Sequence, residues 1–251
     1  MRVFPPLLLL LLVLAACGDS TEPAFQTNDP AADSAFALLA SLNHNTIAEA
    51  YARLNRTPHT AEIELATLDS AGQVLTRSIR RVERRPTADG VQETVVRADT
   101  AAIAPGEESW AEQLTVRNPL PRVLPDDPAF LDPRARDQYR YTMRNDSTRD
   151  GRRRIVEARL RDEVDTEQAI ASARYHLAGE DKTILSVDMR RASTSVLFDE
   201  TSGVQVRLGA TAEGVLVPRI AIMESTVDVP GSPPTRLRLT QRFRDVGTVQ
   251  D

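Results

Sequence analysis

The chain of 251 residues has one cysteine, Cys17, and few aromatic side chains, which make up 4% of it. A lone cysteine provides neither an internal disulfide framework nor a thiolate metal cluster. Lys182 is the one lysine among 31 basic residues, and the net charge is −5. Because general nucleic-acid binders are usually strongly basic, we expect no nucleic acid among the partners.

Motifs for catalysis and metal binding are also absent from the sequence. It contains no G-x-S-x-G, H-E-x-x-H or P-loop pattern. His44, His59 and His176 lie far apart with no ligand spacing, and we interpret them as surface or capping residues. A glycosidase would need two carboxylates across a cleft, which spacing alone does not show. We therefore expect a protein without enzymatic activity, cofactor or metal.

Residues 1–16 have the zones of a secretory signal peptide: a positive start at Arg2, an apolar run over 7–16 and small residues at its end. The run is shorter than the roughly 20 residues that span a bilayer. Leu14-Ala15-Ala16-Cys17 resembles a bacterial lipobox, where the thiol is acylated and the preceding peptide bond is cut. By this resemblance Cys17 is the lipidation site, and several acyl chains would hold the protein on a membrane. The alternative is an ordinary secreted protein with a coincidental cysteine.

Residues 17–32 are rich in Gly, Asp, Ser, Thr and Pro, which predicts a flexible tether. About 15 extended residues reach roughly 50 Å at ~3.3 Å each. In enterobacteria, Asp directly after the acylated Cys favours the inner membrane. Here Gly18 takes that position, so the order resembles an outer-membrane lipoprotein, although the rule differs among phyla. We expect a lipid-anchored protein of the cell envelope that faces the periplasm, with residues 33–251 as a single β-rich domain.

Apolar residues at three- and four-residue steps predict a helix over Ala31–Leu54, with Asp33 as a cap and Asn43–Asn45 as a point where it divides. The pattern then changes to alternation, with turn signals at 69–72 and 87–90. Alternation predicts about eleven antiparallel strands, at 60–68, 74–83, 91–99, 138–143, 153–161, 169–177, 183–190, 194–198, 204–208, 215–227 and 235–246.

Three further stretches bear on function. Residues 103–133 hold six prolines among apolar side chains such as Trp110, which predicts a loop that covers one sheet end or forms a lid over a cavity. The run Arg152–Arg154 is interpreted as a solvated strand end, with anionic headgroups as the alternative. The last strand has an apolar side and an arginine side, which we interpret as a solvated face that discourages edge pairing. The arginines are Arg236, Arg238, Arg242 and Arg244.

A lipobox, a tether, an N-terminal helix and about eleven antiparallel strands resemble the lipoprotein-localisation (LolA/LolB-like) superfamily. So does the end of the chain, where Val217-Pro218 leads into a long strand and 235–246 forms the last one. In that family a curved, unclosed barrel wraps a helix and forms an apolar cavity for acyl chains. The resemblance covers most of the chain after Cys17 and rests on layout. It implies a mainly β fold, a curved antiparallel open barrel around the N-terminal helix. The alternatives are a β-sandwich or a lipocalin-like barrel.

The resemblance also implies a non-catalytic binder or carrier of a hydrophobic ligand or an acylated protein. Period-two alternation puts each apolar set on one face of its strand, which we expect to be the concave, helix-bearing side. The candidate ligand-binding residues are Ile63, Leu65, Leu237, Leu239 and Phe243. The alternative for these five is a plain core. For the whole protein, the alternatives are a structural or assembly lipoprotein that binds protein partners through its sheet surface, and an enzyme.

Overall fold

The computed structural model describes residues 29–100, 127–148, 151–164, 168–179, 182–194, 199–228, 230–231 and 234–247. Several sequence predictions therefore fall outside the described residues. These are the signal peptide, Cys17, most of the tether, most of the proline-rich stretch with Trp110, and the side chain of Arg152. Within the described ranges, no helix is both long and apolar enough to cross a membrane.

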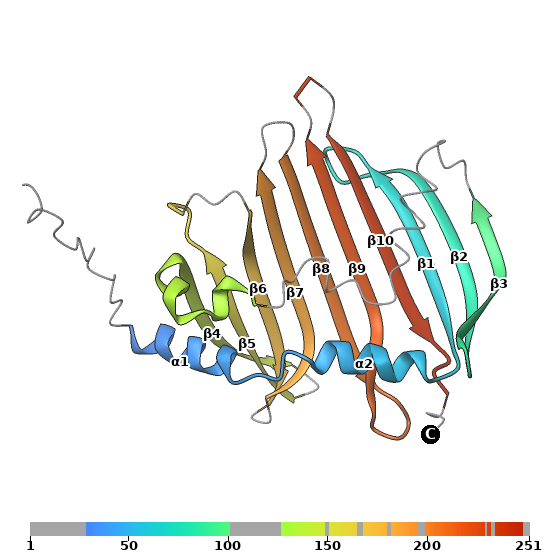
Figure 1. Ribbon diagram of the computed structural model, residues 1–251, viewed down its shortest axis with the longest axis horizontal. Coiled ribbons are helices and arrows are strands. Elements are labelled where there is room, and N and C mark those ends of the chain that lie inside the picture. The colour runs from blue at the N-terminus through green and yellow to red at the C-terminus, as the bar shows by residue number, and fades with distance from the viewer. Residues whose placement is uncertain are drawn as a thin grey trace, which may run out of the picture.

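Two α-helices and two short 3₁₀ helices accompany ten strands (Figure 1). The helices are α1 (Pro30–Ala40), α2 (Thr46–Asn55), η1 (Ala129–Leu131) and η2 (Pro133–Gln138). The strands are β1 (His59–Leu68), β2 (Val74–Thr87), β3 (Gly90–Thr100), β4 (Tyr139–Thr148), β5 (Gly151–Leu160), β6 (Gln168–Ala178), β7 (Thr183–Thr194), β8 (Asp199–Ala210), β9 (Leu216–Asp228) and β10 (Thr235–Arg244).

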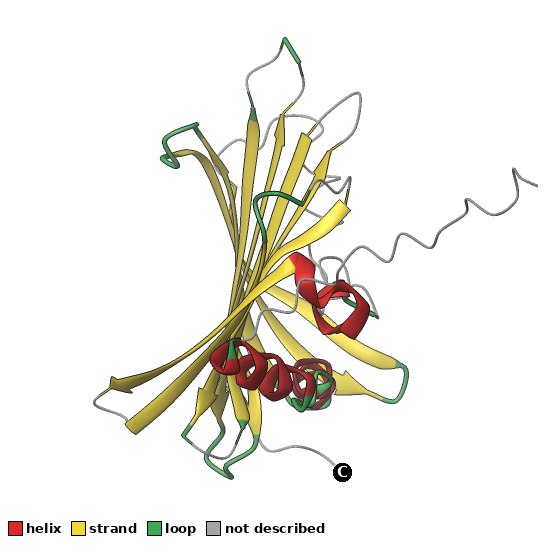
Figure 2. Cartoon of the chain, turned by 90° about the vertical axis from the view of Figure 1, so that its left-hand side faces the viewer, coloured by secondary structure: helices red, strands yellow, loops and turns green. Residues whose placement is uncertain are grey.

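All ten strands form one antiparallel sheet in the order β3-β2-β1-β10-β9-β8-β7-β6-β5-β4. The two ends of this order, β3 and β4, are the sheet edges, so the sheet is curved and open and does not close into a barrel. Figure 2 shows the twisted sheet with the helices on one side. We call this side the inner face and the opposite side the outer face. The predicted mainly β, open and curved fold is confirmed. The sheet has ten strands in place of about eleven, because most of the predicted strand 194–198 lies outside the described residues.

The predicted helix is divided at Asn43–Asn45, as its sequence indicated, and α1 and α2 lie end to end across the sheet (Figure 1). The predicted cap at Asp33 is wrong. Asp29 caps α1 through its side chain, which accepts a hydrogen bond from the Ala31 amide at 2.9 Å, and Pro30 occupies the first helical turn. Asp33 lies in that first turn and pairs instead with Arg136.

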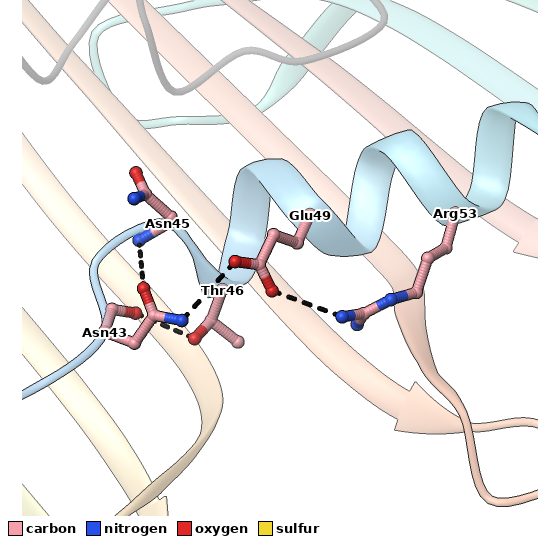
Figure 3. A network of polar contacts seen from close by, with 5 residues as sticks. All are labelled: Asn43, Asn45, Thr46, Glu49 and Arg53. Carbon is pink, nitrogen blue, oxygen red and sulfur yellow. Dashed lines mark hydrogen bonds and ion pairs between the residues drawn. The ribbon is translucent and has the colours of Figure 1, made fainter.

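The break between the helices is held by local polar contacts (Figure 3). The Asn43 side chain accepts from the Asn45 amide at 3.0 Å, and the Asn43 carbonyl accepts from the Thr46 hydroxyl at 2.7 Å. Glu49, one turn into α2, accepts from Asn43 at 3.5 Å and from Arg53 at 3.2 Å. Side chains of this kind compete with the helical backbone for hydrogen bonds, which is why α1 stops here and α2 restarts.

The helices and the inner face share one hydrophobic core. In α2, Tyr51 packs edge-to-face against Phe243 of β10, with ring centroids 6.1 Å apart. In α1, Phe36 packs the same way on Tyr141 of β4 at 5.2 Å. The two helices therefore cover different parts of the sheet: α1 contacts β4 and β5, and α2 contacts β2, β8, β9 and β10.

The outer face carries the predicted arginine side of β10, but this side is paired as well as solvated. Arg242 contacts Glu62 at 3.3 Å and Glu64 at 3.2 Å on β1, and Arg236 contacts Glu224 on β9 at 3.4 Å. Each of these arginine side chains is about one-third exposed, at 35% and 36%. The row thus links β10 to both neighbouring strands.

Candidate functional site

Strand register arranges the middle of the inner face in rows. Residues directly opposite each other on antiparallel strands point to the same face and contact each other. On five consecutive strands, from β1 through β10, β9 and β8 to β7, the register aligns five large apolar side chains. These residues form what we call the apolar row: Leu65, Leu239, Met223, Val204 and Met189. Their exposed fractions lie between 1% and 8%, so the row is buried.

The next row on the same five strands has a different character. This row lies two residues further along each strand from the apolar row. Here the register aligns mostly hydroxyl-bearing and charged side chains, all of them half-buried. We call this the polar row: Thr67, Leu237, Ser225, Ser202 and Arg191. On β2 it continues to Thr76, whose hydroxyl donates to that of Thr67 at 2.9 Å. The inner face therefore changes from apolar to polar over roughly 7 Å, the rise of two strand residues.

All five sequence-predicted ligand residues lie on the inner face, but they do not share one environment. Ile63, Leu65, Leu239 and Phe243 are buried members of the core. Phe243 lies deepest toward the helices, with its ring 5.9 Å from that of His59. Leu237 alone is half-buried and belongs to the polar row. Their role in ligand binding remains a prediction.

Apart from Leu237, sequence reasoning did not single out the members of the polar row. Ser202, Ser225 and Arg191 lie in three different strands, and nothing in their local sequence connects them. Only the pairing register places them side by side. These residues could have been identified from the sequence only if the strand order and register had been predicted correctly.

The histidines are more buried than their predicted surface or capping role implied. His44 lies between the helices, where its Nε2 donates to the Leu39 carbonyl at 2.9 Å. A carbonyl only accepts, so Nε2 carries the proton and Nδ1 accepts from the Tyr175 hydroxyl at 3.0 Å. Burial lowers the pKa of His44. His44 thus caps a carbonyl at the end of α1, in agreement with the capping interpretation, whereas His59 is 5% exposed with its pKa also lowered by burial and is not a surface residue.

The three histidines do not form one metal-binding group within the described residues. Among the residues that the structure describes, no group of three or more His, Cys, Asp or Glu side chains is placed to hold a metal ion. His176 lies on β6 next to Tyr175, and burial and then the charge of Arg174 lower its pKa. The candidate site is therefore described by its strand rows and side-chain contacts.

Two depressions flank the edge strand β4, away from the apolar row. One of about 350 Å³ is lined by Arg140, Thr142, Glu157, Arg159, Leu160, Asp162 and Arg174. The other, of about 290 Å³, is lined by Asp29, Ala32, Arg136, Tyr139, Arg140, Tyr141, Thr142 and Arg161. Arg140 and Thr142 line both, so the two depressions meet at this edge of the sheet.

Comparison with known proteins gave matches to solved structures. No family model matches the chain, and no curated protein matches it. A LolA superfamily protein, NE2245 from Nitrosomonas europaea, is 14% identical, with 84% of this chain and 94% of that chain covered and a TM-score of 0.29. A DUF1329 family protein from Desulfovibrio piger is 9% identical, with coverages of 86% and 92% and a TM-score of 0.30.

A third solved structure, MucB in complex with MucA(peri), is 10% identical, with coverages of 84% and 94% and a TM-score of 0.23. The structural neighbours of the chain thus include a LolA superfamily protein and a DUF1329 family protein, at low identity and low TM-score.

Proposed function

We propose that this protein is a lipoprotein of the cell envelope, anchored in the outer membrane through Cys17 and facing the periplasm. It binds or carries a hydrophobic ligand, or the acyl chains of a partner protein, on the inner face of its sheet and performs no covalent chemistry. The observation that supports this proposal best is the contact between the apolar row and the polar row. An apolar surface with a few polar groups at its rim is the usual composition of a ligand site.

The two rows fit a ligand with an apolar tail and a polar head. The apolar row crosses five strands, which lie about 4.8 Å apart, and so runs for roughly 19 Å as part of the buried core. The hydroxyls of Ser202 and Ser225 lie alongside and can hydrogen-bond a polar head. Leu237 adjoins Leu239 on the same face and is half-buried, so an apolar ligand reaches the inner face there first.

The anchoring part of the proposal is supported by sequence alone. The lipobox-like Leu14-Ala15-Ala16-Cys17 precedes the described residues, and α1 begins at Pro30. The segment between Cys17 and Asp29 is polar and small-residue-rich, which suits a connection between a membrane anchor and a folded body.

Native mass spectrometry tests the binding function. Residues 1–17 are replaced by a signal peptide that is cleaved without lipid attachment, and the protein is purified from the periplasm without detergent. We expect a population whose mass is increased by one lipid, and a Leu237→Glu variant that folds but lacks it. A fully folded protein that never carries lipid, and gains none when lipid is supplied, contradicts the carrier function.

A second candidate function is supported by exposed apolar side chains at the opposite sheet edge. Val74 and Leu75 at the start of β2, and Val95 and Val96 on the edge strand β3, are 46–64% exposed. A protein partner that covers this edge would bury them, which favours an assembly lipoprotein that binds a protein partner. The same mass spectra separate the two functions, because a bound lipid and a bound protein differ greatly in mass.

A further inference from the structure

Two arginines face each other across the β4–β5 strand pair on the outer face: Arg140 is directly opposite Arg159. Continuing across the sheet, Ser172 lies opposite Arg159, and Arg190 lies opposite Ser172. These four residues form what we call the arginine row, which contains three arginines and no acid. Like charges directly opposite each other destabilise a sheet, so this row needs compensation from elsewhere.

The neighbouring row does not provide that compensation. Two residues along the strands, the register aligns Thr142, Glu157, Arg174 and Asp188. In this row the acids are next to an arginine, and Arg174 donates to both carboxylate oxygens of Glu157 at 3.0 and 3.1 Å. Glu157 is therefore already occupied, although it lines the same depression as Arg140 and Arg159.

The loop after β5 compensates the arginine row weakly. Arg140 lies 3.6 Å from Glu163, but the two side chains are 56% and 72% exposed, and exposed ion pairs of this kind contribute little. Asp162 lines the depression and is exposed. For Arg159, the described residues show no ion pair and no side-chain hydrogen bond. Arg159 therefore presents its guanidinium group to the depression.

A third arginine beside Arg140 has an unsatisfied donor. Arg161 lines the adjoining depression, and its Nε is buried with no hydrogen-bond partner in the described part of the chain. A buried donor without a partner is costly, and buried polar groups without partners are uncommon in folded proteins. Facing arginines and an orphaned guanidinium N–H thus lie in adjoining depressions at one edge of the sheet, and both lack acceptors.

We propose that the depression between Arg140 and Arg159 binds a phosphate group, either as free phosphate or as the headgroup of an anionic phospholipid. Each guanidinium presents a planar fork of N–H donors that matches phosphate oxygens, and phosphate has enough oxygens to accept from two arginines at once. The Thr142 hydroxyl in the same depression is a further donor. The bound anion removes the repulsion between the facing arginines. This site is independent of the inner face and of the function proposed above.

Calorimetric titration of the full chain in nonionic detergent at low salt tests this site. One arm uses inorganic phosphate and the other dihexanoyl phosphatidylglycerol, with dihexanoyl phosphatidylcholine as the reference for partition into micelles. We expect saturable binding that the double variant Arg140→Gln/Arg159→Gln weakens about tenfold or more, since charge-assisted hydrogen bonds are lost. The matched control is Arg97→Gln on β3, a 75% exposed arginine at the other sheet edge, which leaves binding unchanged.

The double variant should also melt no lower than the wild type, because it removes a like-charge pair. If the double variant fails to fold, the titration is repeated with the single variant Arg159→Gln, in which Arg140 remains in place, and weaker binding by that variant supports the site. Binding of phosphate alone identifies a free anion as the ligand, and binding of phosphatidylglycerol in competition with phosphate identifies a headgroup. The proposal is overturned if neither compound binds saturably, or if Arg97→Gln weakens binding as much as the double variant does.

Discussion

The imidazole of His44 accepts a hydrogen bond from the Tyr175 hydroxyl at 3.0 Å, across 131 residues of sequence. The other ring nitrogen of His44 donates to the Leu39 carbonyl at the end of α1. His44 is therefore a polar link between the helix junction and β6, the third strand from the β4 edge of the sheet. Because Tyr175 is 2% exposed, little solvent competes for this bond.

Tyr175→Phe should lower the free energy of unfolding by about 1 kcal/mol or more, because His44 Nδ1 loses its donor in a largely buried place. Tyr139→Phe is the control: Tyr139 is also 2% exposed, and no hydrogen bond of its hydroxyl is seen among the described residues. Urea unfolding at pH 7.5 measures both. Equal losses of unfolding free energy in the two variants would show that the hydrogen bond between Tyr175 and His44 adds no stability of its own.

Stability should fall as the pH drops below about 6.5, because burial lowers the pKa of His44, His59 and His176. The unfolded chain then binds protons that the folded chain does not, so the folded state is favoured above pH 6.5 and loses this advantage as the pH falls through the lowered pKa values. Urea unfolding at pH 7.5, 6.0 and 5.0 measures the slope. The double variant His44→Asn/His59→Asn should flatten this dependence of stability on pH. An unchanged slope would contradict the attribution of the dependence to these two histidines.

Glu64→Gln should destabilise the protein by about 1–3 kcal/mol at pH 7, because it breaks a nearly buried pair of ionic contacts. The Glu64 side chain is 10% exposed and lies 3.0 Å from Arg77 and 3.2 Å from Arg242. Burial opposes its charge, but hydrogen bonds from Arg242 and Arg77 outweigh that effect and lower its pKa. The stabilisation is thus present above pH 4.5 and is lost as the pH falls through the lowered pKa.

Glu62→Gln is the matched control for Glu64→Gln. It lies on the same strand and face, with its side chain 30% exposed and one contact, to Arg242 at 3.3 Å. We expect a loss below 1 kcal/mol, as for partly exposed pairs. Thermal melts at pH 7 and pH 3 should show the Glu64→Gln defect shrinking in acid. A defect of the same size at both pH values argues for a packing effect in place of a charge effect.

Local sequence patterns predicted the strands well, because alternation within a strand depends on near neighbours. The strand at 60–68 and the turn at 69–72 are examples: β1 ends at Leu68, and Gly72 has the left-handed φ of 81° that a turn glycine allows. Contacts between distant segments could not be predicted in the same way. Arg242 meets Glu62 and Glu64 only because β10 pairs with β1, and alternation alone carries no information about that pairing.

The same limit applies to the burial of the candidate ligand residues. Leu237 and Leu239 look equivalent in sequence, two apolar residues on one side of one strand, yet one is half-buried and the other 3% exposed. Their difference depends on how far the core extends along β10, which is a property of the assembled sheet. The helix cap was likewise predicted at Asp33 but lies at Asp29, because its position depends on where the helix backbone begins.

Cys17→Ser should release the protein from membranes or leave it as an uncleaved precursor, because serine lacks the thiol that is acylated. Phase partition in detergent and mobility on a denaturing gel measure the two outcomes. A variant that still matures and still partitions with membranes as the wild type does would rule out the lipid anchor.

Leu239→Glu and Leu237→Glu form the sharpest pair for the inner face. Leu239 is 3% exposed in the apolar row, so a glutamate there is a buried charge without a partner, and we expect loss of cooperative thermal unfolding. Leu237, two residues earlier on the same face, is half-buried next to Ser225, so a glutamate there keeps access to solvent and the fold should survive.

If the inner face binds an apolar ligand, Leu237→Glu should abolish lipid co-purification while the melting curve stays cooperative. A folded Leu237→Glu protein that carries lipid as the wild type does would remove Leu237 from the ligand site. A folded Leu239→Glu protein would show that the apolar row is open to solvent, and its lipid content would then decide whether that row binds the ligand.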